Sequence, residues 1–379
     1  MPEVSEAVTN ADYRLMEKAH VQQVEGHLKE GLLKDKVKPR IEIEGRTKLE
    51  TVIPLETPFV VFLDPADICN FQCKFCPTGN RALMKDINRH SGVMNFDLYK
   101  KIIDDLCEFD RPIKVLRLYK DGEPLLNPHF AEMVRYAKKS GCTLQVDTTT
   151  NGSLLNPDRN LELIEAGLDR VNISLEGLTA KAYKEFAGYN LNFDNFVANI
   201  RHFYEHKQNC TVCIKIVGDF LSEEEKNRFF HIFGEIADRV FIEHVAPCWP
   251  EFEMKEVVPS QEVGIYGQAI REVAVCPYIF YSLSINADGK VSLCFLDWSR
   301  KLIVGDVTTD KFKDIWQSEA LLAYQKMHLR KKRKEHAICA ACGQLTHCLP
   351  DDIDPFAETL LKRLEFSLNK GVGDERITL

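Results

Sequence analysis

The stretch FVVFLDPADICNFQCKFCPTGN, residues 59–80, joins an apolar run to a loop that carries three cysteines. The run FVVFLD (59–64) is short and rich in aromatic and β-branched residues, as a buried strand is. Cys69, Cys73 and Cys76 follow it directly, so we expect the three thiols on the loop at the carboxyl end of that strand. A loop with this spacing can wrap an iron–sulfur cube and give each thiolate a different iron. Three thiols leave the fourth iron open.

A structural zinc site is the alternative for this loop. Such sites close with four protein ligands, and no further cysteine or histidine occurs before His90. The loop therefore favours a cluster with one open coordination position.

Five further strand-like runs follow the first, and segments with helix caps separate them. Helix starts are predicted at Asn127-Pro128 and Asn156-Pro157, and Ser222 with Glu225 has the spacing of a capping box. Strands that alternate with helices form right-handed crossovers and a parallel sheet. The pattern predicts an α/β fold, a partial (β/α)6 TIM barrel with a lateral opening and its chemistry at the carboxyl ends of the strands. The runs occupy residues 114–119, 143–148, 169–174, 211–217 and 239–245.

Length and composition limit the class of protein. A chain of 379 residues exceeds the roughly 250–300 at which one core stops growing, so a second, smaller domain is expected. The net charge of -8 argues against nucleic acid as a partner. No apolar run is long enough to cross a membrane and the start lacks a signal peptide, which predicts a cytoplasmic protein. Thirteen cysteines in such a reducing compartment indicate metal or redox chemistry rather than disulfides.

Four segments are predicted along the chain. Residues 1–55 form an extension with an amphipathic helix and a hairpin that turns at Glu44-Gly45. Residues 56–257 form the barrel. Residues 258–350 form a small β-hairpin/helix iron–sulfur domain, with a helix over 260–275 and a hairpin that turns at Asp288-Gly289. Residues 351–379 form a last helix and a tail.

The segment CNFQCKFC (69–76) resembles the CxxxCxΦC loop of the radical S-adenosylmethionine (SAM) superfamily, with Phe75 as the aromatic residue. The resemblance implies that SAM is the last ligand of the open iron. It also implies that the reduced 4Fe-4S cluster cleaves SAM to methionine and a 5'-deoxyadenosyl radical. Because cluster potentials extend down to about -700 mV, a low-potential electron donor such as flavodoxin or ferredoxin is an expected partner.

Two other segments fit this resemblance. LYKDGEPLLNP (118–128) resembles the GGEP motif of the family, which implies that Glu123 takes the SAM ammonium group and that Gly122 lies beside it; Asp121 stands where the first glycine usually is. TTTNG (148–152) and NISLEG (172–177) end the third and fourth strands. Ser174 and Glu176 are expected to meet the SAM carboxylate and ribose.

A second cysteine set lies near the C-terminus. Its spacing resembles the twitch domain of radical SAM dehydrogenases and part of the longer SPASM domain, which implies one auxiliary 4Fe-4S cluster, because the sequence lacks the further cysteines of a second. Structural zinc is the alternative. The expected ligands are Cys276, Cys294, Cys339 and Cys342, with Cys348 as a substitute.

Cys248 follows the sixth strand and so lies at the predicted catalytic face. A cysteine thiol returns a hydrogen atom to the substrate radical in radical SAM epimerases, and Cys248 is a candidate for that role; packing beside Trp249 is the alternative. The remaining cysteines are predicted to be small core residues: Cys107, Cys142, Cys210 and Cys213.

The predicted function is that of a radical SAM oxidoreductase. Its reaction would begin with hydrogen-atom abstraction from a C–H bond of a small polar, sugar- or cyclitol-like substrate. It would end in oxidation, as in a dehydrogenase, or in epimerisation. A peptide-modifying maturase is one alternative. A non-catalytic iron–sulfur scaffold or regulator is another, although a scaffold has no need of an open iron.

Overall fold

A computed structural model describes residues 34–41, 45–254, 257–259, 262–348 and 350–373. The amphipathic helix predicted in the first 33 residues lies outside these ranges. No helix within them is long and apolar enough to cross a membrane.

The six predicted strands are confirmed, and they pair in parallel in chain order. Leu116 and Leu118 of the second strand are buried in the main core, whereas Arg117 between them points to the other face of the sheet. The strands are β1 Val60–Leu63, β2 Ile113–Leu118, β3 Thr143–Thr150, β4 Arg170–Leu175, β5 Thr211–Val217 and β6 Arg239–Glu243.

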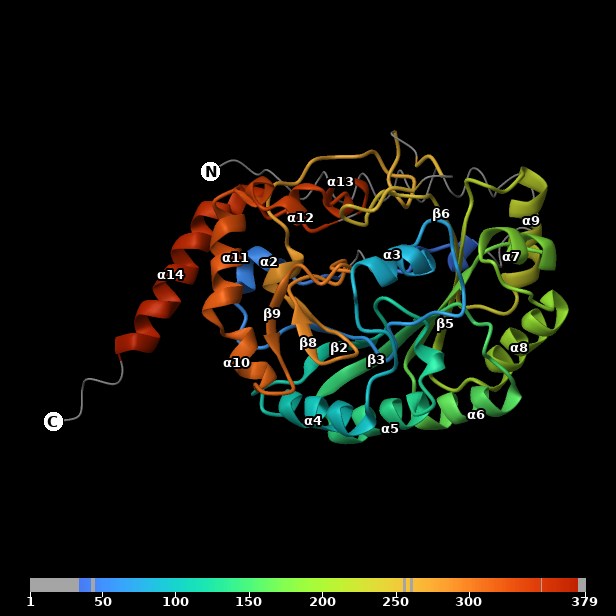
Figure 1. Ribbon diagram of the computed structural model, residues 1–379, viewed down its shortest axis with the longest axis horizontal. Coiled ribbons are helices and arrows are strands. Elements are labelled where there is room, and N and C mark those ends of the chain that lie inside the picture. The colour runs from blue at the N-terminus through green and yellow to red at the C-terminus, as the bar shows by residue number, and fades with distance from the viewer. Residues whose placement is uncertain (1–33, 42–44, 255–256, 260–261, 349, 374–379) are drawn as a thin grey trace.

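Helices cover the outer face of this sheet (Figure 1). The predicted caps hold for the helix after β3, where the Asn156 side chain accepts a hydrogen bond from Arg159 N, and the capping box of Ser222 and Glu225 is present. The start predicted at Pro128 is wrong, because Pro124–Leu126 form a separate 3-10 turn and the helix begins at Phe130. The helices are α4 Phe96–Leu106, α5 Phe130–Ser140, α6 Pro157–Ala166, α7 Ala180–Phe186, α8 Phe193–His206 and α9 Glu223–Phe233.

The predicted C-terminal hairpin continues the barrel sheet. β7 (Ser282–Ile285) lies parallel to β1, with Val60 opposite Ser282, while β8 (Lys290–Ser292) and β9 (Ile303–Asp306) follow in antiparallel order. Gly289 takes the left-handed conformation that the predicted Asp288-Gly289 turn requires, with φ of +89°. The result is one nine-stranded sheet in the order β6-β5-β4-β3-β2-β1-β7-β8-β9.

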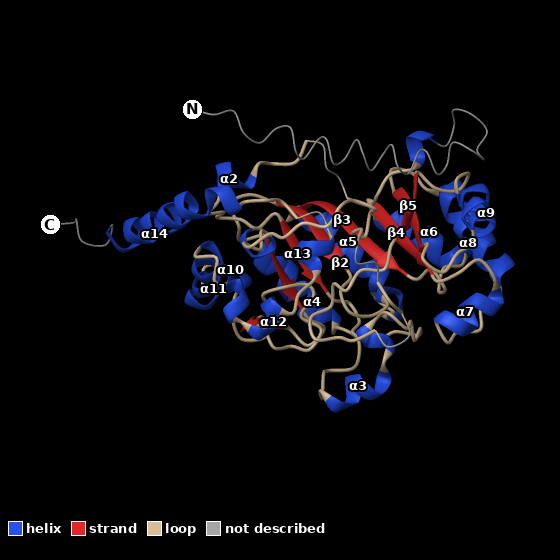
Figure 2. Cartoon of the chain, turned by 90° about the horizontal axis from the view of Figure 1, so that it is seen from above, coloured by secondary structure: helices blue, strands red, loops and turns tan. Residues whose placement is uncertain are grey.

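Short helices complete the chain, and α14 projects from the body in both views (Figures 1 and 2). The helix predicted over 260–275 is wrong, since its described residues form turns and one β-bridge between Val263 and Ala269. The second arm of the predicted N-terminal hairpin is also wrong, because Leu49–Val52 is helical. The remaining helices are α2 Leu49–Val52, α3 Arg81–Asp86, α10 Phe312–Trp316, α11 Glu319–Leu329, α12 Ala337–Ala340, α13 Gln344–His347 and α14 Ala357–Gly373.

Two segments cover the free edge of β6, on the side where the partial barrel is open. Val37 forms a parallel bridge with Val240, and His244 N donates a hydrogen bond to Ile265 O. Tyr266 packs on Phe241 with Ile41 beside them. The N-terminal extension thus becomes part of the barrel wall.

Candidate functional site

The loop after β1 places Cys69, Cys73 and Cys76 near one another. Cys76 N donates a hydrogen bond to Cys73 O at 3.2 Å, and the thiols are close enough to raise one another's pKa. A Cβ on Gly79 would lie 2.5 Å from Cys73 O, so only glycine lets the loop fold back over itself here.

The three thiols suit a cationic iron cluster. Burial, with a smaller contribution from Glu123, raises the pKa of Cys69 to about 12, and burial also raises the pKa of Cys73 and Cys76. Iron is bound by thiolates rather than thiols. The bound cluster would therefore supply the positive charge that stabilises the three thiolates. Phe71 N donates to Cys69 Sγ at 3.4 Å and Asn151 Nδ2 at 3.9 Å, as donors around cluster sulfurs do.

A single zinc ion needs its ligands to converge on one point. Among the described residues, no three His, Cys, Asp or Glu side chains converge to hold one metal ion. Thiolates on a cluster bind different irons and so need not converge on a point.

Gly122 and Glu123 pack directly against this loop. A Cβ on Gly122 would lie 2.2 Å from Ala66 O and 2.3 Å from Ile68 O, which explains the glycine by close backbone approach. Glu123 is buried and its carboxylate accepts hydrogen bonds from Leu125 N, Thr150 Oγ1 and Asn151 N. A carboxylate has about four acceptor positions, so at most one remains for the SAM ammonium group that the sequence predicts here.

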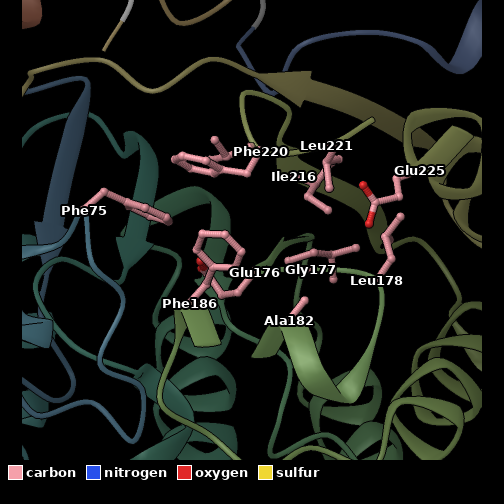
Figure 3. A pocket seen from close by; sticks show the side chains of 12 residues that line it. Phe75, Glu176, Gly177, Leu178, Ala182, Phe186, Ile216, Phe220, Leu221 and Glu225 are labelled. Atoms are coloured by element: carbon pink, nitrogen blue, oxygen red, sulfur yellow. The ribbon is translucent and has the colours of Figure 1, made fainter. Parts of the chain in front are cut away.

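Phe75 and Glu176 line one pocket at the carboxyl ends of β4 and β5 (Figure 3). The rings of Phe75, Phe186 and Phe220 face a common space, and the Phe186 and Phe220 centroids are 5.1 Å apart. Burial raises the pKa of Glu176 to about 7, against the opposing effects of Lys215 and Cys73. The pocket thus places aromatic ring faces beside a carboxylate. Such a lining suits a ligand that has both an aromatic ring and hydroxyl groups.

Ser174 does not line this pocket. It lies on β4 opposite Lys215 of β5. Its predicted contact with the SAM carboxylate, like the other predicted SAM contacts, stays a prediction.

The second cysteine set also comes together. Burial raises the pKa of Cys276 to about 12 and those of Cys339 and Cys342 to about 11. The Cys342 thiol adds to the shift of Cys276 and Cys339, and the Cys248 thiol adds to that of Cys342. Burial and the thiols of Cys276, Cys339 and Cys342 also raise the pKa of Cys294. A Cβ on Gly343 would lie 2.2 Å from Pro247 O, so the CxxC turn sits tightly on the loop after β6.

Cys248 and Cys348 form a separate pair beside this set. Their Sγ atoms are 3.5 Å apart, and Cys348 Sγ also donates to Gln344 Oε1 at 3.2 Å. Both are buried with Leu296, and Trp249 packs against the same cluster. Among the cysteines predicted as core residues, Cys107 is exposed and that prediction is wrong; the other three are buried.

A buried charged network joins the two cysteine regions. Asp121 Oδ2 lies 2.6 Å from Lys120 Nζ and 2.7 Å from Arg300 Nη1, and Arg300 comes from the loop between β8 and β9. Although burial opposes it, Lys120, Arg300 and Arg89 hold the pKa of Asp121 at about 2. Asp121 replaces the first glycine of GGEP, and its charge is matched by a residue of the auxiliary region.

The sequence reasoning missed the charged inner face of the barrel. Arg117, Asp147 and Arg170 face inward from β2, β3 and β4, and Arg40 enters from the N-terminal extension. The signal was present in the strands themselves, since charges at alternate positions of otherwise apolar runs mark one solvated face. Asn151, in the TTTNG segment, was not predicted as a site residue, yet its Nδ2 contacts Cys69 Sγ and Asn70 Oδ1.

The comparisons with known proteins identify the family of the two regions that carry the cysteines. Residues 63–229 match the radical SAM superfamily and residues 276–343 match SPASM, an iron–sulfur cluster-binding domain. The chain is a member of the radical SAM superfamily with a C-terminal SPASM domain. SAM and iron–sulfur clusters, one in the barrel and at least one auxiliary, are its cofactors.

Relatives differ in what their names describe. The chain is 23% identical over 318 residues to an AdoMet-dependent heme synthase of Methanosarcina barkeri, over 73% of this chain and 84% of that one. It is 34% identical over 118 residues to a tungsten-containing aldehyde ferredoxin oxidoreductase cofactor-modifying protein of Pyrococcus furiosus, over 31% of each. The PqqA peptide cyclase of Bradyrhizobium diazoefficiens is 30% identical over 35% of this chain and 32% of its own.

Solved structures share the fold. Native anSMEcpe with bound AdoMet has a TM-score of 0.54 at 14% identity, covering 84% of this chain and all of that one. Streptococcus suis SuiB bound to S-adenosylmethionine has a TM-score of 0.51 at 18% identity, covering 79% and 74%. The partial barrel with its C-terminal extension is therefore the fold predicted from the sequence.

Proposed function

We propose that this radical SAM enzyme oxidises a C–H bond of a small polar substrate held on the inner face of the barrel. One observation carries the proposal. The ring of Phe62, on the inner face of β1, stacks on Phe295 at 4.7 Å, and Phe295 directly follows the cluster-ligand candidate Cys294. The inner face thus lies beside the auxiliary set as well as beneath the loop of Cys69.

The residues have the following roles in this proposal. Cys69, Cys73 and Cys76 would hold the SAM cluster, which with SAM would supply the radical chemistry that removes one hydrogen atom from the substrate. Cys276, Cys294, Cys339 and Cys342 hold an auxiliary cluster, which would supply an electron acceptor. Oxidation of an alcohol to a carbonyl would then release one hydrogen atom to the adenosyl radical, one electron to the auxiliary cluster and one proton to solvent. The Phe75 pocket takes the adenosyl part of SAM, and Glu176 takes its ribose.

Epimerisation is the second candidate reaction. Cys248 lies beside the auxiliary region with its sulfur 3.5 Å from that of Cys348. Donation of its hydrogen atom to the substrate radical would leave a sulfur radical on this pair, and one electron from the low-potential donor and one proton from solvent would restore the thiol. In a Cys248→Ala variant, unchanged rate and stereochemistry would contradict the hydrogen-donor role. A Cys142→Ala variant, which removes a buried cysteine between α5 and β3, is the matched control.

The relatives leave the substrate open, because their names cover heme synthesis, cofactor modification and peptide cyclisation. A peptide substrate therefore stays an alternative. Flavodoxin or ferredoxin is the proposed electron donor, and the reducing conditions that exposed clusters need favour a cytoplasmic enzyme.

Anaerobic incubation of the reconstituted enzyme with SAM and dithionite tests the proposal. We expect 5'-deoxyadenosine to form, and to form faster when small-molecule cell extract is added. A Cys73→Ala variant should abolish it. Absence of 5'-deoxyadenosine from the wild-type enzyme with extract would favour a non-catalytic scaffold.

A further inference from the structure

One row of side chains crosses the inner face of the barrel. In the strand register, Phe62 of β1 lies opposite Arg117 of β2, Arg117 opposite Asp147 of β3, and Asp147 opposite Arg170 of β4. The residues on either side of Arg117 are buried in the main core, so the row points away from the helices. TIM-barrel interiors are usually filled with branched apolar side chains. This interior carries charges instead.

The cations outnumber the acids on this face. Arg117 Nε lies 3.6 Å from Asp147 Oδ2, while Lys215 Nζ and Arg40 Nε lie 2.5 and 3.7 Å from the carboxylate of Glu243. Burial raises the pKa of Asp147, and the charge of Arg170 also opposes this rise. Four cationic side chains therefore face three carboxylates, since the charge of Lys215 also opposes the rise that burial causes in the pKa of Glu176.

Solvent reaches the cations but not Asp147 or Glu243. The side chains of Arg117, Arg40 and Lys215 are 33%, 31% and 20% exposed, whereas those of Asp147 and Glu243 are 5% and 3% exposed. Side chains in the middle row of a sheet are exposed to this degree only where other elements leave that face uncovered. A molecule that enters the barrel thus meets positive charge first.

The pairing on this face is incomplete. Arg117 Nε, Asp147 Oδ1 and Glu243 Oε1 are buried and have no hydrogen-bond partner within the described part of the protein. Arg40 and Arg117 are also near enough to repel each other. Arg117 Nη1 already donates to Tyr119 Oη at 3.1 Å, but an anion would accept a hydrogen bond from the unpartnered Arg117 Nε and would offset the repulsion between the two guanidinium groups. The two carboxylate oxygens would instead need a donor, such as a hydroxyl group of the same ligand.

We propose that the inner face of the barrel binds an acidic group of the substrate, a carboxylate or a phosphate, against Arg40 and Arg117. This inference rests on the proposed function for the location of the substrate. The stack of Phe62 and Phe295 adjoins the row, and the Arg117 guanidinium lies 5.4 Å from the Phe62 ring centre. The acidic group would thus be anchored deep in the barrel, with the rest of the molecule extending toward the cysteine loops.

Arg40 adds a second feature. It belongs to the segment that pairs with the free edge of β6, and Arg170 donates a hydrogen bond to its carbonyl oxygen. The anion site is therefore completed by the N-terminal extension rather than by the barrel alone.

Calorimetric titration of the anaerobically reconstituted full chain with acetate and with inorganic phosphate tests the inference. The titrations are done in chloride-free buffer with saturating SAM, so that the SAM carboxylate site is filled. We expect saturable binding of at least one anion. Tighter binding of acetate would identify a carboxylate site, and tighter binding of phosphate a phosphoryl site.

Substitutions on this face should change the anion affinity in opposite directions. Arg117→Gln and Arg40→Gln should each weaken binding roughly tenfold or more, the usual effect of losing a charged hydrogen bond. Asp147→Asn should tighten it, because it removes a competing buried carboxylate. Arg201→Gln, on the exposed side of α8, is the matched control and should bind as the wild type. Cluster absorbance and circular dichroism verify that each variant is folded, and Arg40→Gln stays informative if Arg117→Gln does not fold.

No saturable binding of either anion, or wild-type binding by both arginine variants, would overturn the inference. The outcome is separate from that of the proposed function, which is read from 5'-deoxyadenosine. Anion binding without SAM cleavage would uphold the site and reject the function, and cleavage without anion binding would do the reverse.

Discussion

Replacing Arg300 by methionine should destabilise the protein strongly, although Arg300 belongs to none of the cysteine sets. Its guanidinium is buried 2.7 Å from Asp121 and also lies 3.8 and 3.9 Å from Asp67 and Asp64. The residue adopts a left-handed backbone with φ of +58°, which costs about 1 kcal/mol or more for a side chain other than glycine. The contacts of Arg300 must offset this strain.

The magnitude follows from burial. Removing one partner of a buried ion pair costs about 3–5 kcal/mol, because the other charge is left uncompensated. Arg89 and Lys120 remain beside Asp121 and keep the loss toward the lower end. Arg330→Met is the matched control: it also breaks a pair with a carboxylate, Glu365, but both side chains are about half exposed, so about 1 kcal/mol or less is expected.

Urea unfolding of the reconstituted enzyme under anaerobic conditions measures the difference. Tryptophan fluorescence suits it, because Arg89 Nη1 donates to the carbonyl of Trp298 and one of the three tryptophans thus adjoins the network. We expect a much lower midpoint for Arg300→Met than for Arg330→Met. Adding Asp121→Asn to Arg300→Met should cost less than the sum of the two single changes. Equal midpoints for the two arginine variants, or additive effects of Arg300 and Asp121, would refute the reasoning.

Three further predictions concern pH and the cysteine regions. Burial, and after it the charge of Asp121, raises the pKa of Asp64 to about 8. Between about pH 4 and 8 the folded state therefore keeps a proton that the unfolded state has lost. The free energy of unfolding should fall by about 1.4 kcal/mol for each pH unit across this range because of this group. Asp64→Asn should flatten that slope in unfolding curves measured across the range, and an unchanged slope would count against it. Cys339→Ala should lower the iron content by about four per chain while Cys348→Ala leaves it unchanged; iron loss in both would make Cys348 a ligand. Gly79→Ala should impair loading of the SAM cluster, seen as lower absorbance after reconstitution, because its Cβ would meet the Cys73 backbone; normal loading would contradict this.

Much of the site was predictable because its signals are local. Three thiols on one loop are positioned by the few residues between Cys69 and Cys76. The strand that places them is recognised from its own apolar run. The same holds for the hairpin turn at Gly289, whose φ is a property of that residue.

Other parts could not be predicted, because distant segments compete for the same positions. The helix expected over 260–275 gives way to pairing of Ile265 with His244 along the barrel edge. Cys248 and Cys348 are 100 residues apart, and only the seating of the CxxC turn on the loop after β6 brings them together.

The sequence by itself determined the strands of the barrel, the two cysteine sets and hence the class of chemistry, because periodicity and ligand spacing act over a few residues. The tertiary structure alone decided that β7 extends the sheet beside β1, that Arg300 neutralises Asp121, and that Arg40 joins Arg117 on the inner face. Each of these is a contact between charges or backbone groups far apart in the chain. Which distant residues pair depends on which buried charges and backbone groups would otherwise lack a partner. That depends on the whole tertiary structure rather than on any single segment.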